Sequence, residues 1–360
     1  LFSLLKSLLI ILVFPIYLIP AIILKILNFR ILNINYWQIG TYTQQFDLVY
    51  KFNDKDYKVF CCIPKNLSSS NFFTSVVKTK FTVIENYFLC LIFLPFFYFN
   101  FLKLQNISTD EGFSYNKCFS IFNKQDTSQL YLSHINKLKF EKKLLDDLNL
   151  DNMKICSLHI RNLGTIRDSN LDDYFLAVRY LSEIGVTVIR FCEKYSNINE
   201  KWKLSNYREI LLDQNTKNLQ FKIISKSLFM ISNNSGPANI ATILKIPLLL
   251  SNAFPYNKIF NYNEKDITLP KRIKKNNKFL TLDEIINKKY THAGSEKFFK
   301  SENAKIINNT PNEILDSVKE MIKNLESEKI DFKYNKKNYL NIFDYGNGNL
   351  SNIFTEKSIR

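Results

Sequence analysis

The segment spanning residues 227–250 constrains the fold more than any other part of the chain. Residues 228–231 form a short apolar run, residues 232–236 are turn formers, and Pro237 suits a first helical position. The apolar residues that follow recur on one helical face: Ile240, Ala241 and Leu244. A second apolar run closes the segment at Leu250. Because a short helix joins the two runs with almost no spare residues, the sequence predicts a βαβ unit with parallel strands.

The turn inside this unit consists of Asn233, Asn234, Ser235 and Gly236. It lies at the carboxyl end of a predicted strand and the amino end of a predicted helix. Unpaired N–H groups and the helix dipole favour an anionic group such as a phosphate there. The alternative is an ordinary βα loop, in which these residues serve only as cap and turn.

A second β-α-β pattern precedes this unit in the chain. Residues 155–160 are a predicted strand, residues 171–181 carry one apolar helical face, and Gly185 ends that helix. Residues 186–191 are the next predicted strand. The second half of the chain therefore reads as an α/β domain with a doubly wound parallel sheet.

A chain of 360 residues is long enough for about two domains, and we place the boundary near Asp151. Residues 35–150 would form the first α/β domain and residues 151–330 the second. Residues 331–360 are polar and Asn-rich, and predict a peripheral tail.

Several local patterns predict further elements. Residues 36–60 alternate enough to hold one or two strands, with residues 39–41 as a βα turn, and residues 134–150 predict a connecting helix. Residues 271–278 carry five basic side chains and no acid, which predicts a solvated loop, with a phosphate or membrane contact as the alternative. Residues 310–313 predict a helix start with a capping box.

An uncharged apolar run of 17 residues occupies positions 8–24. This length is at the short limit for a spanning helix, and Pro15 and Pro20 would kink it. Residues 1–34 therefore predict a membrane anchor or monotopic helix, with a buried helix as the alternative and a cleaved signal peptide as a weaker one. A second apolar run at residues 87–102 is too short to span and predicts a core segment or a contact with a membrane interface.

The composition limits the class of partner only loosely. The formal net charge of +16 suits nucleotide diphosphates, nucleic acid or an anionic membrane surface, although an AT-rich genome could equally produce the Lys bias. The six cysteines show no C-x-x-C spacing, which indicates buried thiols in a reducing compartment. Only three histidines are present, which argues against catalysis by a His-rich metal cluster, and we expect neither a metal ion nor a cofactor.

Polar side chains also follow the strands of the second β-α-β pattern. His159 and Arg161 come at the end of the first strand, and Arg190 lies near the end of the next. In a doubly wound sheet they would open on the same edge as the Ser-Gly turn, where Arg161 could fork onto a diphosphate. The alternative for the two arginines is a salt bridge with acids such as Asp168 or Glu193, and for His159 a purely structural role.

At these residues the chain resembles a family of bacterial glycosyltransferases of GT-B type. The elements that carry the resemblance cover residues 155–325: His159-x-Arg161, Asn170 to Tyr174, Val188 to Arg190, Asn234 to Gly236 and Asn309 to Ile314. The H-x-R element is similar to one in α1,2- and α1,6-fucosyltransferases, and the Ser-Gly loop is similar in position to that of heptosyltransferases. The chain departs from the fucosyltransferase pattern after Arg161, where Asn162, Leu163 and Gly164 stand in place of a second arginine and an acid. It also lacks a histidine after Gly40, where relatives often carry a Gly-His pair.

The resemblance implies two facing Rossmann-like domains, the second of which binds a nucleotide-sugar donor while the first presents a glycan or lipid-linked acceptor. It implies a glycosyltransferase of surface-polysaccharide assembly at the cytoplasmic face of a bacterial inner membrane. With no D-x-D motif in the sequence, we expect a metal-independent reaction in which His159, Arg161, Arg190 and the turn residues Asn233 to Gly236 bind the donor diphosphate.

The sequence leaves the catalytic base and two other functions open. A carboxylate of the first domain would deprotonate the acceptor hydroxyl, with Asp47, Glu85, Asp110 and Glu111 as candidates. The first alternative function is a catalytically degenerate GT-B body that binds or assembles at the membrane. The second is a nucleic-acid-binding protein, for which the sequence shows no recognisable module, so we expect no nucleic-acid partner.

Overall fold

The structure is a computed structural model that describes residues 15–52, 57–99, 101–102, 125–139, 150, 153–193, 200–213, 216–256, 263–287, 290, 295–327 and 349–351. The chain forms two compact units, Leu1–Thr127 and Ser128–Arg360. The division falls earlier than the predicted boundary near Asp151, because helix α6 packs on helix α9 of the second unit.

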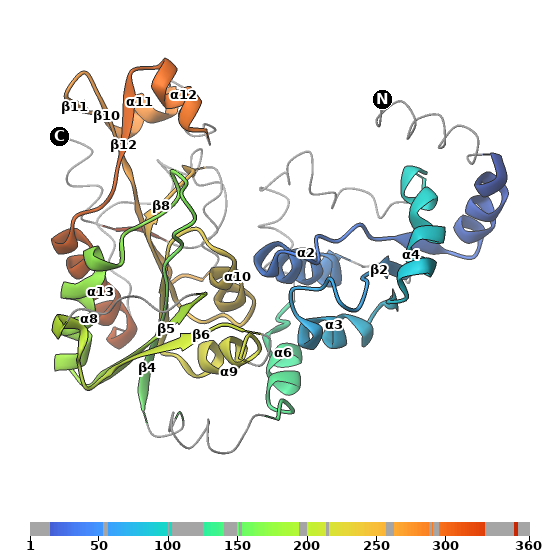
Figure 1. The fold of residues 1–360 in the computed structure, drawn as a ribbon, viewed down its shortest axis with the longest axis horizontal. Coiled ribbons are helices and arrows are strands. Elements are labelled where there is room, and N and C mark those ends of the chain that lie inside the picture. Colours follow the sequence, from blue (N-terminus) through green and yellow to red (C-terminus); the bar gives the residue numbers. More distant parts are fainter. Residues whose placement is uncertain are drawn as a thin grey trace. The chain divides into compact units, whose positions relative to one another are not determined.

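The first unit is built on a three-stranded parallel sheet in the order β1-β2-β3 (Figure 1). Its strands are β1 (Phe29–Ile31), β2 (Lys58–Cys62) and β3 (Thr82–Ile84). Its helices are α2 (Ile39–Phe52), α3 (Asn71–Lys78), α4 (Tyr87–Phe93), the 3-10 helix η1 (Leu94–Tyr98) and an N-terminal helix at residues 15–26. Helices α2 and α3 connect successive strands, which is the βαβαβ arrangement of a parallel sheet.

Helix α2 corrects the prediction of strands within residues 36–60, of which only residues 58–60 belong to a strand. Tyr42, Phe46 and Val49 follow one another at helical spacing and are fully buried. The predicted βα turn at residues 39–41 is the first turn of this helix. The alternation was misread because one apolar helical face also places apolar residues a few positions apart.

The two apolar runs of the first unit form helices that are partly buried. Residues 15–26 of the first run are helical, and its residues 8–14 lie outside the described residues. Within the described ranges, no helix is long and apolar enough to cross a membrane. The second run is divided at Pro95 into α4 and η1, which bury Cys90 and Phe96 and leave Phe88 exposed.

The second unit contains a seven-stranded sheet in the order β13-β9-β8-β7-β4-β5-β6, with every neighbouring pair parallel. Its strands are β4 (Lys154–His159), β5 (Val186–Cys192), β6 (Tyr207–Leu211), β7 (Phe229–Ser232), β8 (Leu248–Ala253), β9 (Ile267–Pro270) and β13 (Asn349–Leu350). Helices α8 (Phe175–Glu183) and α13 (Pro311–Glu326) cover one face, and α9 (Leu219–Lys226) and α10 (Gly236–Ile243) cover the other (Figure 1). The predicted doubly wound parallel sheet is therefore confirmed for this unit.

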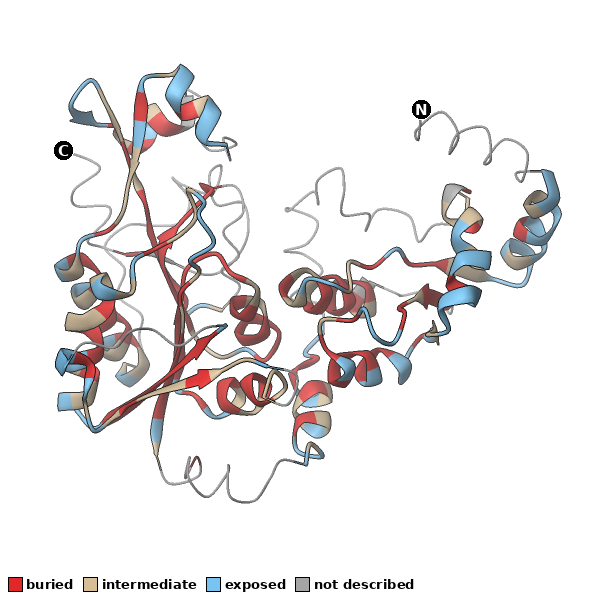
Figure 2. Ribbon diagram, in the orientation of Figure 1, coloured by how far each residue is buried: buried red, intermediate tan, exposed pale blue. Residues whose placement is uncertain are grey.

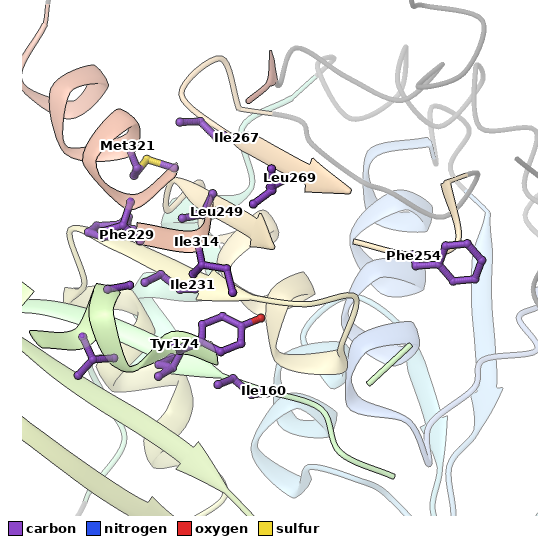
Figure 3. Packing of buried hydrophobic residues seen from close by; sticks show 14 of the residues in the cluster. Ile160, Tyr174, Phe229, Ile231, Leu249, Phe254, Ile267, Leu269, Ile314 and Met321 are labelled. Carbon is purple, nitrogen blue, oxygen red and sulfur yellow. The ribbon is translucent and has the colours of Figure 1, made fainter. Parts of the chain in front are cut away.

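The core of the second unit lies between this sheet and helices α8 and α13 (Figure 3). Phe229, Ile231 and Leu249 from the central strands meet Ile314 and Met321 of α13, all of them buried (Figure 3). Strands buried on both faces read as continuous apolar runs, which is why the two β-α-β patterns were recognisable in the sequence.

The starts of three helices test the remaining local predictions. Thr310 and Glu313 form the predicted capping box at the start of α13. The 3-10 helix η2 (Leu171–Tyr174) precedes α8, so the helical face at residues 171–181 is confirmed in two pieces. Helix α6 (Ser128–Ile135) begins earlier than the helix predicted at residues 134–150, whose residues 140–149 lie outside the described residues.

A small antiparallel sheet corrects the prediction of a solvated loop at residues 271–278. Its order is β11-β10-β12, with β10 (Arg272–Lys275), β11 (Lys278–Phe279) and β12 (Ala304–Ile307), and helices α11 (Leu282–Asn287) and α12 (Glu296–Ser301) accompany it. Asn276 and Asn277 have positive φ angles of 49° and 62°, which suits a two-residue hairpin turn. The segment forms strands because β12 supplies a pairing partner that local sequence does not reveal.

The carboxyl-terminal segment contributes to the main sheet. Residues 349–350 form β13, which pairs in parallel with β9, and Ser351 is buried. The predicted peripheral tail is therefore wrong for residues 349–351, and the rest of residues 331–360 lies outside the described residues.

Candidate functional site

The order of the main sheet reverses between β4 and β7. The chain continues from β4 to β5 and β6 on one side, and from β7 to β8 and β9 on the other. The helix that follows β4 and the helix that follows β7 lie on opposite faces of the sheet (Figure 1). Such a reversal opens a crevice at the carboxyl ends of the two strands, which is where ligands bind in open α/β sheets.

The predicted residues of two strand ends meet at this edge of the sheet. His159 of β4 and Ser232 of β7 are register partners, and the Ser232 hydroxyl donates a hydrogen bond of 3.1 Å to the His159 carbonyl oxygen. The structure therefore brings Arg161 and the turn from Asn233 to Gly236 to one place, as the sequence predicted.

Asn233 ties the loop after β4 to the turn after β7. Its side-chain oxygen accepts a 3.0 Å hydrogen bond from the Arg161 backbone N–H, and its amide nitrogen donates to the Arg167 carbonyl oxygen at 3.2 Å. Asn233 is fully buried. This side chain therefore holds the loop after β4 and the turn after β7 in a fixed arrangement.

The loop after β4 is organised around Asp168. One carboxylate oxygen accepts backbone N–H groups from Leu163 at 2.6 Å and Thr165 at 2.7 Å, and the other lies 3.2 Å from Arg161 Nε. Burial raises the pKa of Asp168, but the donors of Thr165 and Leu163 outweigh burial, so the pKa lies below its ordinary value. Asp168 is thus an anion that shapes the loop and orients Arg161.

Arg161 pairs with Asp168 through one nitrogen only. Its two terminal nitrogens have no hydrogen-bond partner among the described residues, and its side chain is 23% exposed. The salt bridge foreseen as the alternative is therefore present, but it leaves the outer edge of the guanidinium available to a ligand with two acceptor oxygens.

Arg167 is a second arginine of this loop that the sequence analysis did not single out. Its NH2 group donates to the Asn234 carbonyl oxygen, and its buried Nε has no hydrogen-bond partner among the described residues. Burial, followed by the nearby charge of Arg161, lowers its pKa from the ordinary value. Its position between a predicted strand and a predicted helix could have identified it as a candidate site residue.

The start of α10 lacks the usual side-chain cap. Ser235 has the extended backbone of an N-cap residue, but its hydroxyl lies 2.9 Å from His159 Nδ1 and 2.8 Å from the Ser232 hydroxyl instead of capping the helix. The first N–H groups of α10 are therefore left for another acceptor, and the helix dipole makes an anion favourable there.

His159 is part of this polar network and not a cation. Burial, followed by the charges of Arg190 and Arg161, lowers the pKa of His159 to about 4. A neutral imidazole near Ser235 keeps the serine hydroxyl away from the helix start. The structure therefore gives His159 a supporting position at the site.

Arg190 does not join the site as a free cation. It forms an ion pair with Glu209, its register partner on β6, and the Tyr207 hydroxyl donates to the same carboxylate at 2.8 Å. Arg190 is 8% exposed. The alternative interpretation of Arg190 as a salt bridge thus holds, with Glu209 and not Glu193 as its partner.

Lys271 stabilises the loop after β4 through hydrogen bonds to its backbone. Its ammonium group donates to the carbonyl oxygens of Ile166 at 2.8 Å and Asp168 at 2.6 Å, and it is 2% exposed. Burial lowers the pKa of Lys271 to about 8, while Asp168 and Asp173 oppose that shift. The sequence analysis had assigned this lysine to a solvated loop.

The candidate bases of the first unit have structural partners where they are described. Asp47 is buried and pairs with Lys51 at 2.7 Å, and Glu85 pairs with Lys78. Asp110 and Glu111 lie outside the described residues. Across the described ranges, no group of three or more His, Cys, Asp or Glu side chains is arranged to hold a metal ion.

Comparisons with known proteins give structural likeness alone. No family model matches the chain, and no curated protein does so either. A glycosyl transferase family 9 protein from Veillonella parvula is 11% identical, with a TM-score of 0.47, covering 83% of this chain and 96% of that one. Escherichia coli heptosyltransferase WaaC with ADP is 8% identical, with a TM-score of 0.41, covering 67% and 93%.

Escherichia coli ADP-heptose lps heptosyltransferase II is 12% identical, with a TM-score of 0.37, covering 62% of this chain and 83% of that one. With TM-scores below 0.5, none of these likenesses carries a function over to this chain.

Proposed function

We propose that the chain is a glycosyltransferase that binds a nucleoside-diphosphate sugar at the β4–β7 edge. The observation that carries the proposal is the reversal of strand order, where the terminal nitrogens of Arg161 and the uncapped start of α10 lie at the same edge of the sheet. A diphosphate is the ligand that such a pair of donors suits, because it offers two adjacent anionic groups. The family resemblance of residues 155–325 supports the sugar nucleotide as the source of that diphosphate.

The reaction breaks the bond between the anomeric carbon and the diphosphate oxygen. The acceptor hydroxyl oxygen forms the new bond to that carbon, and its proton passes to a base. Arg161, Arg167 and the N–H groups of α10 would stabilise the negative charge that develops on the leaving diphosphate. Three fixed positive groups supply the charge that a cation supplies elsewhere, which supports the expectation of a metal-independent reaction.

The acceptor in this proposal is a glycan or a lipid-linked saccharide of bacterial surface-polysaccharide assembly, met at the cytoplasmic face of the inner membrane. The family resemblance supports this acceptor and this location. The doubly wound sheet and the proposed diphosphate site support only the binding of the donor. The base remains with the candidates Asp47, Glu85, Asp110 and Glu111.

One observation favours donor binding without turnover as a second candidate function. Asp47 and Glu85 are engaged in ion pairs with Lys51 and Lys78, so neither described candidate is a free carboxylate. In that case the chain would be a degenerate GT-B body that retains its donor site.

A thermal-shift panel with UDP-, GDP-, CMP-, dTDP- and ADP-linked sugars tests the donor site. We expect one nucleotide class to raise the melting temperature, and Arg161→Ala to abolish that rise. The matched control is Arg179→Ala, because Arg179 is an exposed arginine of α8 in a surface pair with Glu183. No rise with any donor, from folded wild-type protein, would remove the proposal.

Release of the nucleoside diphosphate then separates the two candidate functions. Turnover in the presence of acceptor extracts, lost in Arg161→Ala and kept in Arg179→Ala, supports the transferase. A donor that binds but is never consumed with any extract supports the degenerate body.

A further inference from the structure

Most of the exposed large apolar side chains of the first unit lie in two segments. Of the eighteen exposed large hydrophobic residues in the described part of the chain, six lie at residues 16–27 and six at residues 87–94. The most exposed are Ile26 at 76%, Phe88 at 74% and Ile16 at 71%. Contiguous exposed apolar surface of this kind marks an interaction site on a soluble domain.

The two segments adjoin because both are anchored in one aromatic cluster. Tyr17 of helix 15–26 contacts Phe96 of η1, with ring centroids 5.0 Å apart, and both residues pack in the cluster around Phe60. Phe93 at the end of α4 contacts Phe60 at 5.4 Å. The outer faces of helix 15–26 and α4 are coloured as exposed in Figure 2. We call these two outer faces together the apolar surface.

The charged residues on helix 15–26 and directly after it, Lys25 and Arg30, are positive, and the acid that precedes α4, Glu85, is paired with Lys78. The chain has no acidic residue before Asp47, and residues 87–102 carry no charge. Lys25 Nζ lies 5.3 Å from the ring centroid of Phe101, and Lys58 Nζ lies 5.5 Å from that of Phe29, both rings of the same cluster. Cations at the border of an apolar surface complement the headgroups of anionic lipids.

A second copy of the chain fits this surface less well than a bilayer does. A symmetric dimer would place the same surface on both sides of the contact, so that two surfaces bordered by lysines and without opposite charges would meet. A spanning helix is not an option for the described residues, where none is long and apolar enough. A position in the membrane interface requires neither a second copy of the chain nor a spanning helix.

We propose that the outer faces of helix 15–26 and α4 form one monotopic surface that inserts into the interfacial layer of an anionic lipid bilayer. Apolar side chains enter the boundary between headgroups and acyl chains, and Lys25 and Lys58 contact the anionic headgroups. The helix at residues 15–26 then lies in the membrane plane together with α4. This inference concerns the first unit and does not depend on the proposed donor site.

Vesicle sedimentation of the full chain tests the surface with three pairs of substitutions. One pair is Ile19→Ser with Ile23→Ser on the N-terminal helix, and the second is Phe88→Ser with Ile92→Ser on α4. The matched control is Phe279→Ser with Ile184→Ser, which removes an exposed Phe and an exposed Ile of the second unit. All four native residues of the two test pairs are at least half exposed, so the fold does not depend on them.

We expect wild-type protein to bind vesicles that contain an anionic lipid, and each helix pair to weaken binding about tenfold or more through lost apolar burial. The control pair should bind as wild type does. Lys25→Gln with Lys58→Gln should weaken binding to anionic vesicles and leave binding to neutral vesicles unchanged, and added salt should act in the same way.

Two results would overturn the proposal. One is wild-type binding strength in both helix pairs when circular dichroism shows that the variants are folded. The other is wild-type protein that ignores vesicles but self-associates with rising concentration, with that association lost in the helix pairs. The second result would assign the surface to a dimer contact.

Discussion

Two arginines near the carboxyl edge of the main sheet have carboxylate partners but differ in what remains available to a ligand. Arg190 lies inside β5, is 10% exposed at the side chain, and meets a Glu209 carboxylate that Tyr207 also contacts. Arg161 lies just beyond β4, is 23% exposed, and uses only Nε to contact Asp168. Both β4 and β5 pair on two sides, so the difference follows position along the strand: Arg190 lies opposite Glu209 inside β5, whereas Arg161 lies beyond the last residue of β4. A position beyond the end of a strand therefore leaves part of a guanidinium unpaired, while a position inside the sheet gives it a structural partner.

The largest effect that would test this comparison is expected at Arg190. Arg190→Ala leaves Glu209, whose side chain is 4% exposed, as a buried carboxylate without its cation. We expect a loss of about 3–5 kcal/mol in the free energy of unfolding, measured with urea. A loss as small as that of a surface pair would show that Arg190 is not the structural arginine described here.

The next effect concerns pH, because His159 lies close enough to both arginines to feel their charge. Its pKa is about 4 in the folded chain and 6.5 ordinarily, so the unfolded chain binds more protons between these values. Stability is then full above pH 6.5 and falls as the pH drops toward 4, by up to about 3 kcal/mol. Urea titrations across this window should show a shallower fall in His159→Asn. An identical pH slope in both proteins would contradict the assignment of His159 as a neutral imidazole.

Arg161→Lys sharpens the comparison by keeping the charge and removing the fork. We expect donor affinity to fall about tenfold, with about 1 kcal/mol or less change in unfolding free energy, because a single ammonium cannot hold two phosphate oxygens. Calorimetric titration with the donor found in the thermal-shift panel measures the affinity. Equal affinity in the two proteins would mean that Arg161 acts only as a point charge.

The smallest effect is expected at Arg179, which sets the baseline for an arginine in a fully solvated pair. Its side chain is 53% exposed and that of its partner Glu183 is 64% exposed. We expect Arg179→Ala to change unfolding free energy by about 0.5 kcal/mol or less. A larger change would remove it as the control for Arg161 and would call for another exposed arginine.

The fold of the second unit was predictable where its signals are local. Residues 227–250 and 155–191 each contain a complete strand-turn-helix-strand pattern, and both are confirmed. Strands β10 and β13 were missed because each depends on a distant partner, β12 for one and β9 for the other. Short strands that pair over long sequence separations leave little trace in their own composition.

The candidate site was predictable in position but not in detail. Strand ends pointed to Arg161 and to the turn at residues 233–236, because parallel strands open on one edge. Sequence could not show that Ser235 turns its hydroxyl to His159 and leaves α10 uncapped, since that contact joins residues 76 positions apart. Nor could it show that Lys271 supports the loop, because burial of a lysine depends on the sheet around it.

The position of β13 has a consequence for synthesis of the chain. Among the described strands, only β13 pairs with the outer edge of β9, and parallel pairing over ~80 positions is intrinsically slow, so this edge stays unpaired until residues 349–351 have been synthesised. Ser351 also links this edge to a helix. Its backbone N–H donates to the Thr268 carbonyl oxygen of β9 at 2.8 Å, and its hydroxyl donates to Glu320 of α13 at 2.7 Å. Loss of these few residues would leave an unpaired, apolar strand edge, which is a template for aggregation. Pairing of the carboxyl-terminal segment with β9 thus protects this edge of the newly formed sheet from pairing with other chains.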